Sequence, residues 1–225
     1  MYNLTFDAIQ YNESKTKNKR RKLILESCFK LCVQNGIRHL TIEQLMSAAH
    51  FEFRTFYNYY ESVNILLEDI MISAMLAVYD YEYFRFYEGE SLFDILMQYG
   101  DQFIAHAYEL RDVVIYIDDY DHHFTFEYVS ERYTEMVKRI LTYPMLTIQK
   151  FPVLAKAFEN IEPTIILENI QMFTSTLFIY LSRLIRRENI YSHNLTFLSQ
   201  EGLHNLKRSL AVAVSQRLES YRKQI

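Results

Sequence analysis

The sequence predicts an all-α protein, from its few turn residues, its apolar spacing and its helix-start signals. The 225 residues include Gly 4 and Pro 3, and the turns of β-sheet proteins consume both types. Apolar residues recur three and four positions apart along most of the chain, which is the spacing of one helix face. Hydrophobic residues make up 50% of the chain, enough for a sizeable buried core.

The first helix is predicted to start at a basic cluster, Lys15 to Lys22, in which six of eight residues are lysine or arginine. This cluster is either a solvated helix start or an arm that seeks phosphate. Gly36 is expected to end the helix in a left-handed cap. The expected apolar stripe comprises Leu23, Ile24, Ser27, Cys28, Leu31 and Cys32. Its two cysteines are expected to be small buried side chains rather than a disulfide or a metal pair.

Two shorter helices are predicted next. Thr41 with Gln44 three residues later is a capping-box signature, and Ile42, Leu45 and Met46 supply one apolar face. A third helical pattern starts near Phe53, after a short connection. Its aromatic residues at helical spacing are Phe56, Tyr57 and Tyr60.

Longer helices are predicted in the rest of the chain. Ser62 opens a pattern that persists to about Tyr87 and stops at Gly89, and Ser91 with Asp94 starts another helix. Pro144 and Pro152 are expected to interrupt the helical pattern, whereas Pro163 suits a first helical position. The last two helices are predicted at about Pro163–Glu188 and Ser199–Arg222.

Charge is distributed unevenly along the chain, although the net charge is only −4. Residues 1–70 carry nine basic and eight acidic side chains, residues 71–143 carry five and fourteen, and residues 144–225 carry ten and six. This asymmetry suggests separate roles for the ends and the middle. No apolar run approaches the ~18 residues of a membrane span, and the N-terminus does not read as a secretory signal. We therefore expect a cytoplasmic protein with no membrane partner.

The N-terminal pattern resembles the TetR family of bacterial transcriptional regulators. The resemblance covers Ile24–Ile70, about a fifth of the chain. The residues that fall in register with the family pattern are Gly36, Thr41, Leu45, Ala49, Thr55, Phe56, Tyr57, Tyr59, Tyr60, Ser62 and Leu66. The resemblance implies a DNA-binding helix-turn-helix domain with a basic arm, residues 1–61. It also implies a helical effector-binding and dimerisation domain, residues 62–225.

In the resembled family the third helix enters the major groove, so Phe53–Tyr60 would be the recognition helix, with Phe56 and Tyr60 facing the small core. The residues expected to contact DNA are Thr41, Gln44, Arg54, Thr55, Tyr57, Asn58, Tyr59 and Ser62. Arg54 could read guanine, and tyrosine hydroxyls could bind phosphate oxygens.

The chain departs from the family pattern at three positions. His50 replaces the usual turn glycine, and histidine can adopt a positive φ at modest cost. Glu52 replaces the usual serine cap, and Val63 replaces a lysine that touches phosphate. These last two changes oppose or remove DNA contact.

An effector pocket is implied for the second domain, whose middle part is rich in tyrosine. The candidate ligand-binding residues are Tyr83, Tyr87, Phe103, His106, Tyr116 and Tyr120. The surrounding negative charge makes a lipophilic cation a candidate effector. The alternative is that these aromatic residues fill an ordinary core.

Ile117 to Phe124, with the sequence IDDYDHHF, combines carboxylates and histidines that could ligate a transition metal. Adjacent residues on a helix point ~100° apart, so the five polar side chains cannot all converge. We therefore interpret the segment as a solvated acidic loop and expect no metal site. The sequence likewise suggests no cofactor and no catalytic constellation.

The two C-terminal helices are expected to form a homodimer, as in the resembled family. Their apolar stripes are Ile166, Ile170, Phe173, Leu177, Leu181 and Leu184, then Leu203, Leu206, Leu210, Val214 and Leu218. A two-fold dimer would bind a palindromic operator in double-stranded DNA.

The leading hypothesis is a ligand-responsive regulator, most simply a repressor, rather than an enzyme. One alternative is an all-helical small-molecule-binding protein or enzyme with incidental N-terminal similarity. A further alternative is a co-regulator that has lost specific DNA binding.

Overall fold

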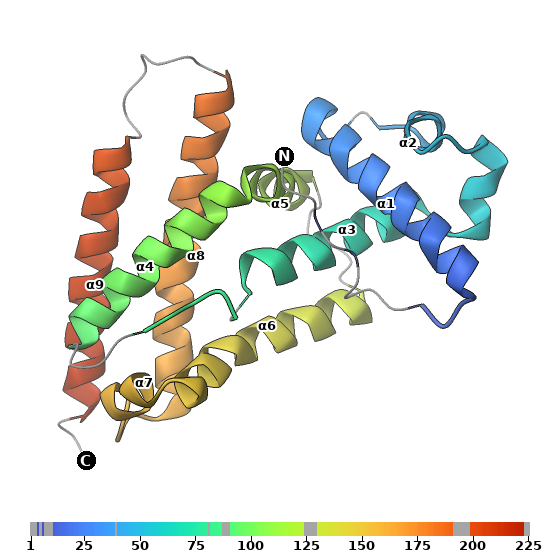
Figure 1. Cartoon of the computed structure of the whole chain (residues 1–225). Coiled ribbons are helices and arrows are strands. Elements are labelled where there is room, and N and C mark those ends of the chain that lie inside the picture. Colours follow the sequence, from blue (N-terminus) through green and yellow to red (C-terminus); the bar gives the residue numbers. More distant parts are fainter. Residues whose placement is uncertain are drawn as a thin grey trace. The chain divides into compact units, whose positions relative to one another are not determined.

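The all-α prediction is confirmed by the computed structural model, whose described residues form helices joined by turns (Figure 1). It describes the chain except residues 1–3, 5, 7–10, 39, 81, 87–90, 124–129, 191–198 and 223–225. The helices are α1 (Lys15–Asn35), α2 (Ile42–Ala48), the 3₁₀ helix η1 (Phe53–Asn58), α3 (Val63–Val78), α4 (Leu92–Glu109), α5 (Arg111–His123), α6 (Glu131–Lys150), α7 (Pro152–Ala157), α8 (Pro163–Ile190) and α9 (Gln200–Arg222).

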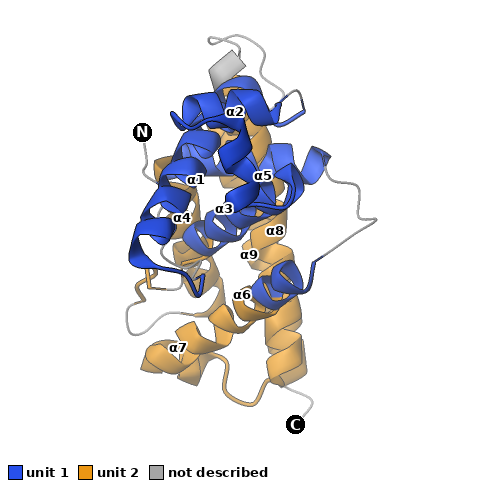
Figure 2. Cartoon of the chain, turned by 90° about the vertical axis from the view of Figure 1, so that its right-hand side faces the viewer, with its two compact units in different colours: residues 1–78, 110–137 blue, residues 79–109, 138–225 orange. Residues whose placement is uncertain are grey.

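The chain divides into two compact units that do not follow the expected boundary after residue 61 (Figure 2). Unit 1 comprises residues 1–78 and 110–137, and unit 2 comprises residues 79–109 and 138–225. Unit 1 is larger than a three-helix domain because α3 and α5 pack against each other and against α1. Helix α6 belongs to both units, since its first turns lie in unit 1 and its remainder in unit 2.

Helix α1 turns only part of the expected face to the core, because Ile24, Cys28 and Cys32 are buried as predicted but Leu23 is not. Leu23 is 45% exposed, whereas Leu25 and Phe29 are buried together with Ile24, Cys28 and Cys32. The buried stripe is therefore rotated by about one residue, because α2, α3 and α5 all cover α1. The prediction for the cysteines is confirmed, since both are free and buried.

Most of the predictions for the end of α1 and the start of α2 are confirmed. Thr41 and Gln44 form the complete capping box of α2, with the Thr41 N–H donating to Gln44 Oε1 over 2.9 Å. Gly36 has φ 75° and donates to the Cys32 carbonyl over 2.8 Å, which confirms the positive φ. Its ψ of 162° lies outside the left-handed helical region, in a conformation that only glycine adopts easily.

Two boundary predictions are wrong. Helix α3 ends at Val78 instead of near Tyr87, because the Asp80 carboxylate accepts the Glu82 N–H over 3.0 Å and closes a turn. Pro144 lies inside α6 and does not interrupt it. The buried positions Met136, Ile140 and Ile148 share one face on both sides of this proline, so packing outweighs the lost backbone hydrogen bond.

Unit 2 is built on α4, α8 and α9, which pack on one another. Pro163 begins α8 as expected. The segment Pro163–Glu188 has the length and composition of a membrane span, but Phe173, Leu177 and Leu181 are fully buried as in the core helix of a globular unit. The stripe of α9 is buried at Leu203, Val214 and Leu218 and half-buried at Leu206 and Leu210.

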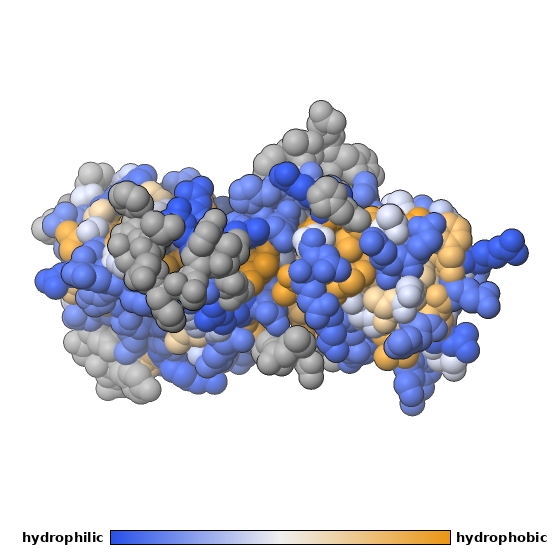
Figure 3. Space-filling model, turned by 90° about the horizontal axis from the view of Figure 1, so that it is seen from above, coloured by the Kyte–Doolittle hydropathy of each residue, from blue (hydrophilic) through white to orange (hydrophobic). Residues whose placement is uncertain are grey.

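This burial corrects the sequence argument for dimerisation. The sequence predicts that the two apolar stripes need a partner subunit, but unit 2 covers most of both with its own helices. Among the side chains of α8 and α9 that the structure describes, the exposed large hydrophobic ones are instead Met172, Ile179 and Val212. Hydrophilic residues cover most of the molecular face shown in Figure 3, where hydrophobic residues form smaller patches.

Candidate functional site

The segment from α2 to η1 forms a helix-turn-helix in unit 1. The Phe51 N–H donates to the Met46 carbonyl over 2.9 Å, which holds the turn against the end of α2. His50 has φ 59°, so it adopts the positive φ for which the resembled family usually has a glycine. The short connection places η1 directly against α2.

Helix η1 buries Phe56 and exposes both polar and aromatic residues, since Phe53 is 41% exposed. Phe56 and Tyr60 are buried, as expected for residues of the small core. Arg54, Tyr57 and Asn58 are exposed, with Tyr57 at 58%. The recognition segment is a short 3₁₀ helix rather than an α-helix to Tyr60. It nevertheless displays three of the residues expected to contact DNA.

The other predicted contact residues have structural roles as well. Thr41 and Gln44 are exposed at the start of α2, where they complete its cap. Ser62 accepts the Ile65 N–H over 3.3 Å and so caps α3. Thr55 and Tyr59 are half-buried.

The basic cluster forms the first two turns of α1, and its Arg21 is buried in interactions within unit 1. Arg21 is buried, pairs with Glu13 at 2.6 Å and lies over the Tyr11 ring at 3.6 Å. Its guanidinium also donates to the Tyr59 carbonyl at the end of η1. Arg21 therefore supports the recognition segment from behind.

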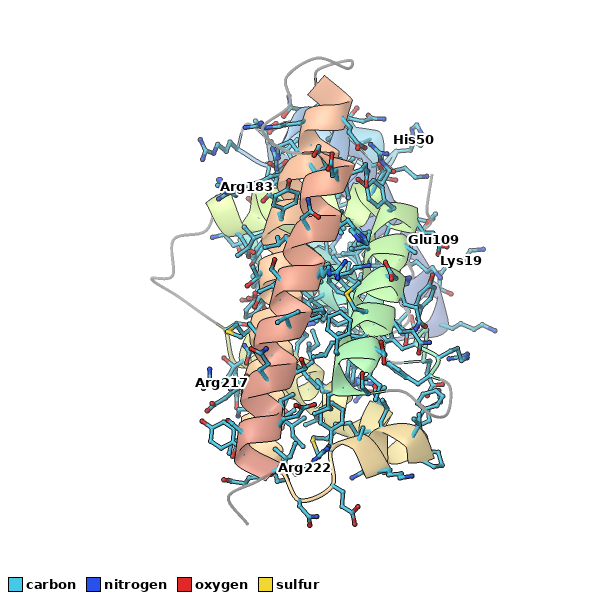
Figure 4. All side chains as sticks on the ribbon, turned by 90° about the vertical axis from the view of Figure 1, so that its left-hand side faces the viewer. Lys19, His50, Glu109, Arg183, Arg217 and Arg222 are labelled. Carbon is cyan, nitrogen blue, oxygen red and sulfur yellow. The ribbon has the colours of Figure 1, made fainter. Side chains whose placement is uncertain are left out.

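The remaining basic side chains are placed differently. Lys15, Lys19 and Arg20 are exposed, and the Lys19 side chain extends outward in Figure 4. Lys17 pairs with Glu13 at 2.9 Å. The first turn of α1 contains no acidic residue, although its N-terminus would favour negative charge. Positive side chains that oppose the helix dipole are well suited to bind an external anion.

The two departures from the family pattern beside η1 also have clear positions. Glu52 is exposed and precedes η1 without a side-chain cap hydrogen bond. Val63 is the first residue of α3 and is half-buried. Neither side chain offers a hydrogen-bond donor to a phosphate.

A buried polar cluster in unit 1 had no counterpart in the sequence predictions. The Asp69 carboxylate is fully buried, accepts the Tyr11 hydroxyl and pairs with Arg132 at 2.7 Å. Arg132 also donates to the Tyr11 hydroxyl over 3.3 Å. Burial raises the pKa of Asp69, while the Tyr11 hydrogen bond and the Arg132 charge oppose that rise. The only signal in the sequence is an aspartate between the apolar positions Leu67 and Ile70.

The pocket in unit 2 is lined by α4, α6, α7, α8 and the segment 79–86. It holds about 790 Å³ of empty space, a volume that includes its open mouth. Aromatic side chains contribute strongly to its walls: Tyr79, Phe84, Phe86, Tyr99, Tyr143 and Phe158.

The candidate ligand-binding residues do not gather around this pocket. Tyr83 stacks on His106 at 4.0 Å between ring centroids, and Phe103 is fully buried beside Tyr79 and Tyr99. Tyr116 and Tyr120 belong to unit 1, where the Tyr116 hydroxyl donates to the Leu67 carbonyl over 2.7 Å. None of these five side chains lines the pocket, and Tyr87 lies outside the described residues.

The acidic segment near Ile117 is helical, which corrects the predicted loop. Residues up to His123 belong to α5, because buried Val113, Val114 and Ile117 anchor its inner face. Phe124 lies outside the described residues. Asp121, His122 and His123 are exposed at the end of the helix.

These features define an all-helical protein with a helix-turn-helix unit and a second unit that contains an apolar pocket. A TetR-family transcriptional regulator from Streptomyces coelicolor aligns over 92% of this chain and 88% of its own, with TM-score 0.57 and 13% identity. A TetR-family regulator from Marinobacter aquaeolei VT8 aligns over 89% of this chain and 97% of its own, with TM-score 0.54 and 16% identity. No protein-family model and no curated protein matches the sequence. The chain has the fold of the TetR-family transcriptional regulators.

Proposed function

We propose that this protein is a transcriptional regulator, most simply a repressor, that binds DNA as a homodimer and is released by a small-molecule effector. The observation that carries the proposal is the exposed surface of η1, where Arg54, Tyr57 and Asn58 project beside a capped α2. In a helix-turn-helix, such a surface reads base edges, and the N-terminus of the neighbouring helix binds phosphates. A cytoplasmic location follows from this role.

The basic start of α1 supports the same proposal. Lys15, Lys19 and Arg20 are exposed in the unit that contains the helix-turn-helix. Phosphate contacts supply much of the affinity of a DNA-binding protein and make it depend on salt. The net charge of the whole chain is negative, so this local positive charge would orient the protein on DNA.

The dimer is proposed to form through the exposed face of α8. Met172 and Ile179 lie seven residues apart on that face, and Arg183 is exposed one turn further on (Figure 4). The exposed Val212 of α9 would extend the contact. A two-fold arrangement would pair two recognition segments and favour a palindromic operator.

Helix α6 is proposed to carry the effector signal. Its second half lines the pocket at Ile140, Tyr143 and Thr147, and its first turn supplies Arg132 to the buried carboxylate of α3. A ligand that shifts α6 would thereby disturb the Arg132–Asp69 pair. Because Tyr11 contacts both Asp69 and Arg21, that disturbance would reach the end of η1.

The test is selection of duplexes from a random DNA library, followed by fluorescence-anisotropy titration. We expect a palindromic consensus and a specific affinity about 10³-fold or more above that for scrambled DNA. Equal affinity for selected and scrambled duplexes would reject the proposal. That result would favour a co-regulator that has lost specific binding, a candidate supported by Glu52 and Val63 beside η1.

A further inference from the structure

In the part of the chain that the structure describes, the walls of the unit 2 pocket carry no side chain that is charged near neutral pH. The lining residues, all within the described part of the chain, include no aspartate, glutamate, lysine, arginine or histidine. A charged ligand group enclosed there would lose its hydration without gaining an opposite charge, and such a loss is costly. This lining does not favour the lipophilic cation suggested by the acidic middle of the sequence.

The polar groups of the pocket are neutral, and two of its hydroxyls already donate hydrogen bonds to backbone carbonyls. The Thr147 hydroxyl donates to the Tyr143 carbonyl over 2.9 Å, and the Thr174 hydroxyl donates to the Ile170 carbonyl over 2.8 Å. Each threonine oxygen keeps only acceptor capacity for a ligand. Burial raises the pKa of Tyr99, so its phenol is neutral near pH 7.

The aromatic walls favour a ligand that contains rings. Phe84 lies 4.7 Å from Tyr99 between ring centroids, and Phe86 lies 6.4 Å from the same ring. Aromatic pairs at such distances add to the free energy of burial when they meet in offset or edge-on arrangements. A flat apolar ligand between these walls could form the same arrangements.

We infer that the pocket binds an uncharged, largely apolar ring compound, such as one with a single hydroxyl or N–H donor. This inference names the effector class and rests on the proposed function. The donor would meet the threonine oxygens, while the rings would replace water along the aromatic walls. The ligand would enter without any counter-charge.

The experiment uses the neutral fluorescent probe N-phenyl-1-naphthylamine and its anionic 8-sulfonate. The cationic test compares methyltriphenylphosphonium with its neutral isostere 1,1,1-triphenylethane as competitors of the probe. We expect the neutral member of each pair to bind about tenfold more tightly or better, because the charged member loses hydration. A charged member that binds as tightly as its neutral counterpart overturns the inference.

Two leucines of α6 provide a matched pair of variants. Leu141 lines the pocket and is 36% exposed, whereas Leu146 is 40% exposed and is absent from the lining. Leu141→Trp should fill the pocket and weaken probe binding about tenfold or more, while Leu146→Trp should bind as the wild type does. The chain has no tryptophan, so emission from each new side chain reports whether that variant is folded.

The outcomes separate this inference from the proposed function. Equal probe binding by the two folded variants, or no saturable binding by the wild type, overturns the ligand assignment. The wild-type comparison of charged and neutral compounds needs no variant, so it decides even if Leu141→Trp does not fold. Failure of the proposed function would appear in the DNA titration, which is independent of the probe.

Discussion

Arg132, in the first turn of α6, forms a 2.7 Å ion pair with the buried carboxylate of Asp69 in α3. The Tyr11 hydroxyl bonds to the same carboxylate, and the Tyr11 ring lies against Arg21. Arg21 in turn donates to the Tyr59 carbonyl. Residues before α1 therefore help to join α3 and α6 to the end of the recognition segment.

Arg132→Ala should destabilise the protein by about 1–3 kcal/mol, because it leaves a buried carboxylate with one partner fewer. The measurement is urea unfolding followed by circular dichroism. Arg139→Ala is the matched control, since Arg139 is exposed on the same helix and its loss should cost less than about 0.5 kcal/mol. A cycle with Tyr11→Phe should show non-additive losses, and additive losses would contradict a shared cluster.

Asp69 should give the stability a defined pH dependence. Burial raises the pKa of its carboxyl above the ordinary value, so the native state holds this proton more tightly than the unfolded chain. The stabilisation that this proton gives to the native state is full below the ordinary carboxyl pKa of about 4. It is lost as pH rises through the raised pKa. The unfolding free energy of the wild type, minus that of the non-titrating Asp69→Asn variant, should therefore decrease as pH rises. A constant difference across acidic and neutral pH would contradict this assignment.

Arg54→Ala and Tyr59→Phe should both weaken DNA binding, but in different ways. If Arg54 reads a base, its loss should cost about 1–3 kcal/mol on the selected operator and relax specificity at one position. If the Tyr59 hydroxyl binds phosphate, its removal should weaken selected and scrambled duplexes alike. Anisotropy titration measures both, with Arg217→Ala on α9 as the control. Wild-type affinity in both variants would remove these residues from the interface.

The basic cluster should be tested by neutralising charges, because deleting residues 1–19 would also remove Tyr11 and Glu13 from the buried interactions. A variant with Lys15, Lys19 and Arg20 changed to glutamine should lower the slope of log affinity against log salt. The expected decrease is ~0.9 for each phosphate that the variant no longer neutralises. The control changes Lys156, Arg208 and Arg217 to glutamine and alters the net charge equally. Identical slopes for both variants and the wild type would show that the cluster is a solvated helix start.

Ile179→Glu should convert the proposed dimer into monomers without unfolding it. Ile179 is 53% exposed, so a glutamate there opposes burial against a partner but not the fold of its own chain. Changing Phe173 and Leu177 would instead break the core of unit 2, where both are fully buried. Light scattering should give twice 27.1 kDa for the wild type and for the control Leu146→Glu. A wild-type mass near that of one chain at micromolar concentration would reject the dimer.

The sequence by itself determined the helical class and several helix starts. The Thr41 capping box, the Ser91–Asp94 start and the proline at the start of α8 all depend on residues within one turn of each other. Such short-range signals act before any tertiary contact forms, which is why these predictions are confirmed. The same holds for the positive φ at Gly36 and His50, since a tight turn demands it locally.

Only the tertiary structure decided which faces are buried and where the functional groups meet. The inward face of α1 and the burial of the α8 stripe depend on the helices that cover them, among them α5 for α1 and α4 for α8. Helix α6 continues through Pro144 with buried side chains on both sides of it. The pocket and the Arg132–Asp69 pair likewise join side chains from separate helices. Periodicity shows that a helix has an apolar face, but the free energy of burial is settled by the partner that covers it.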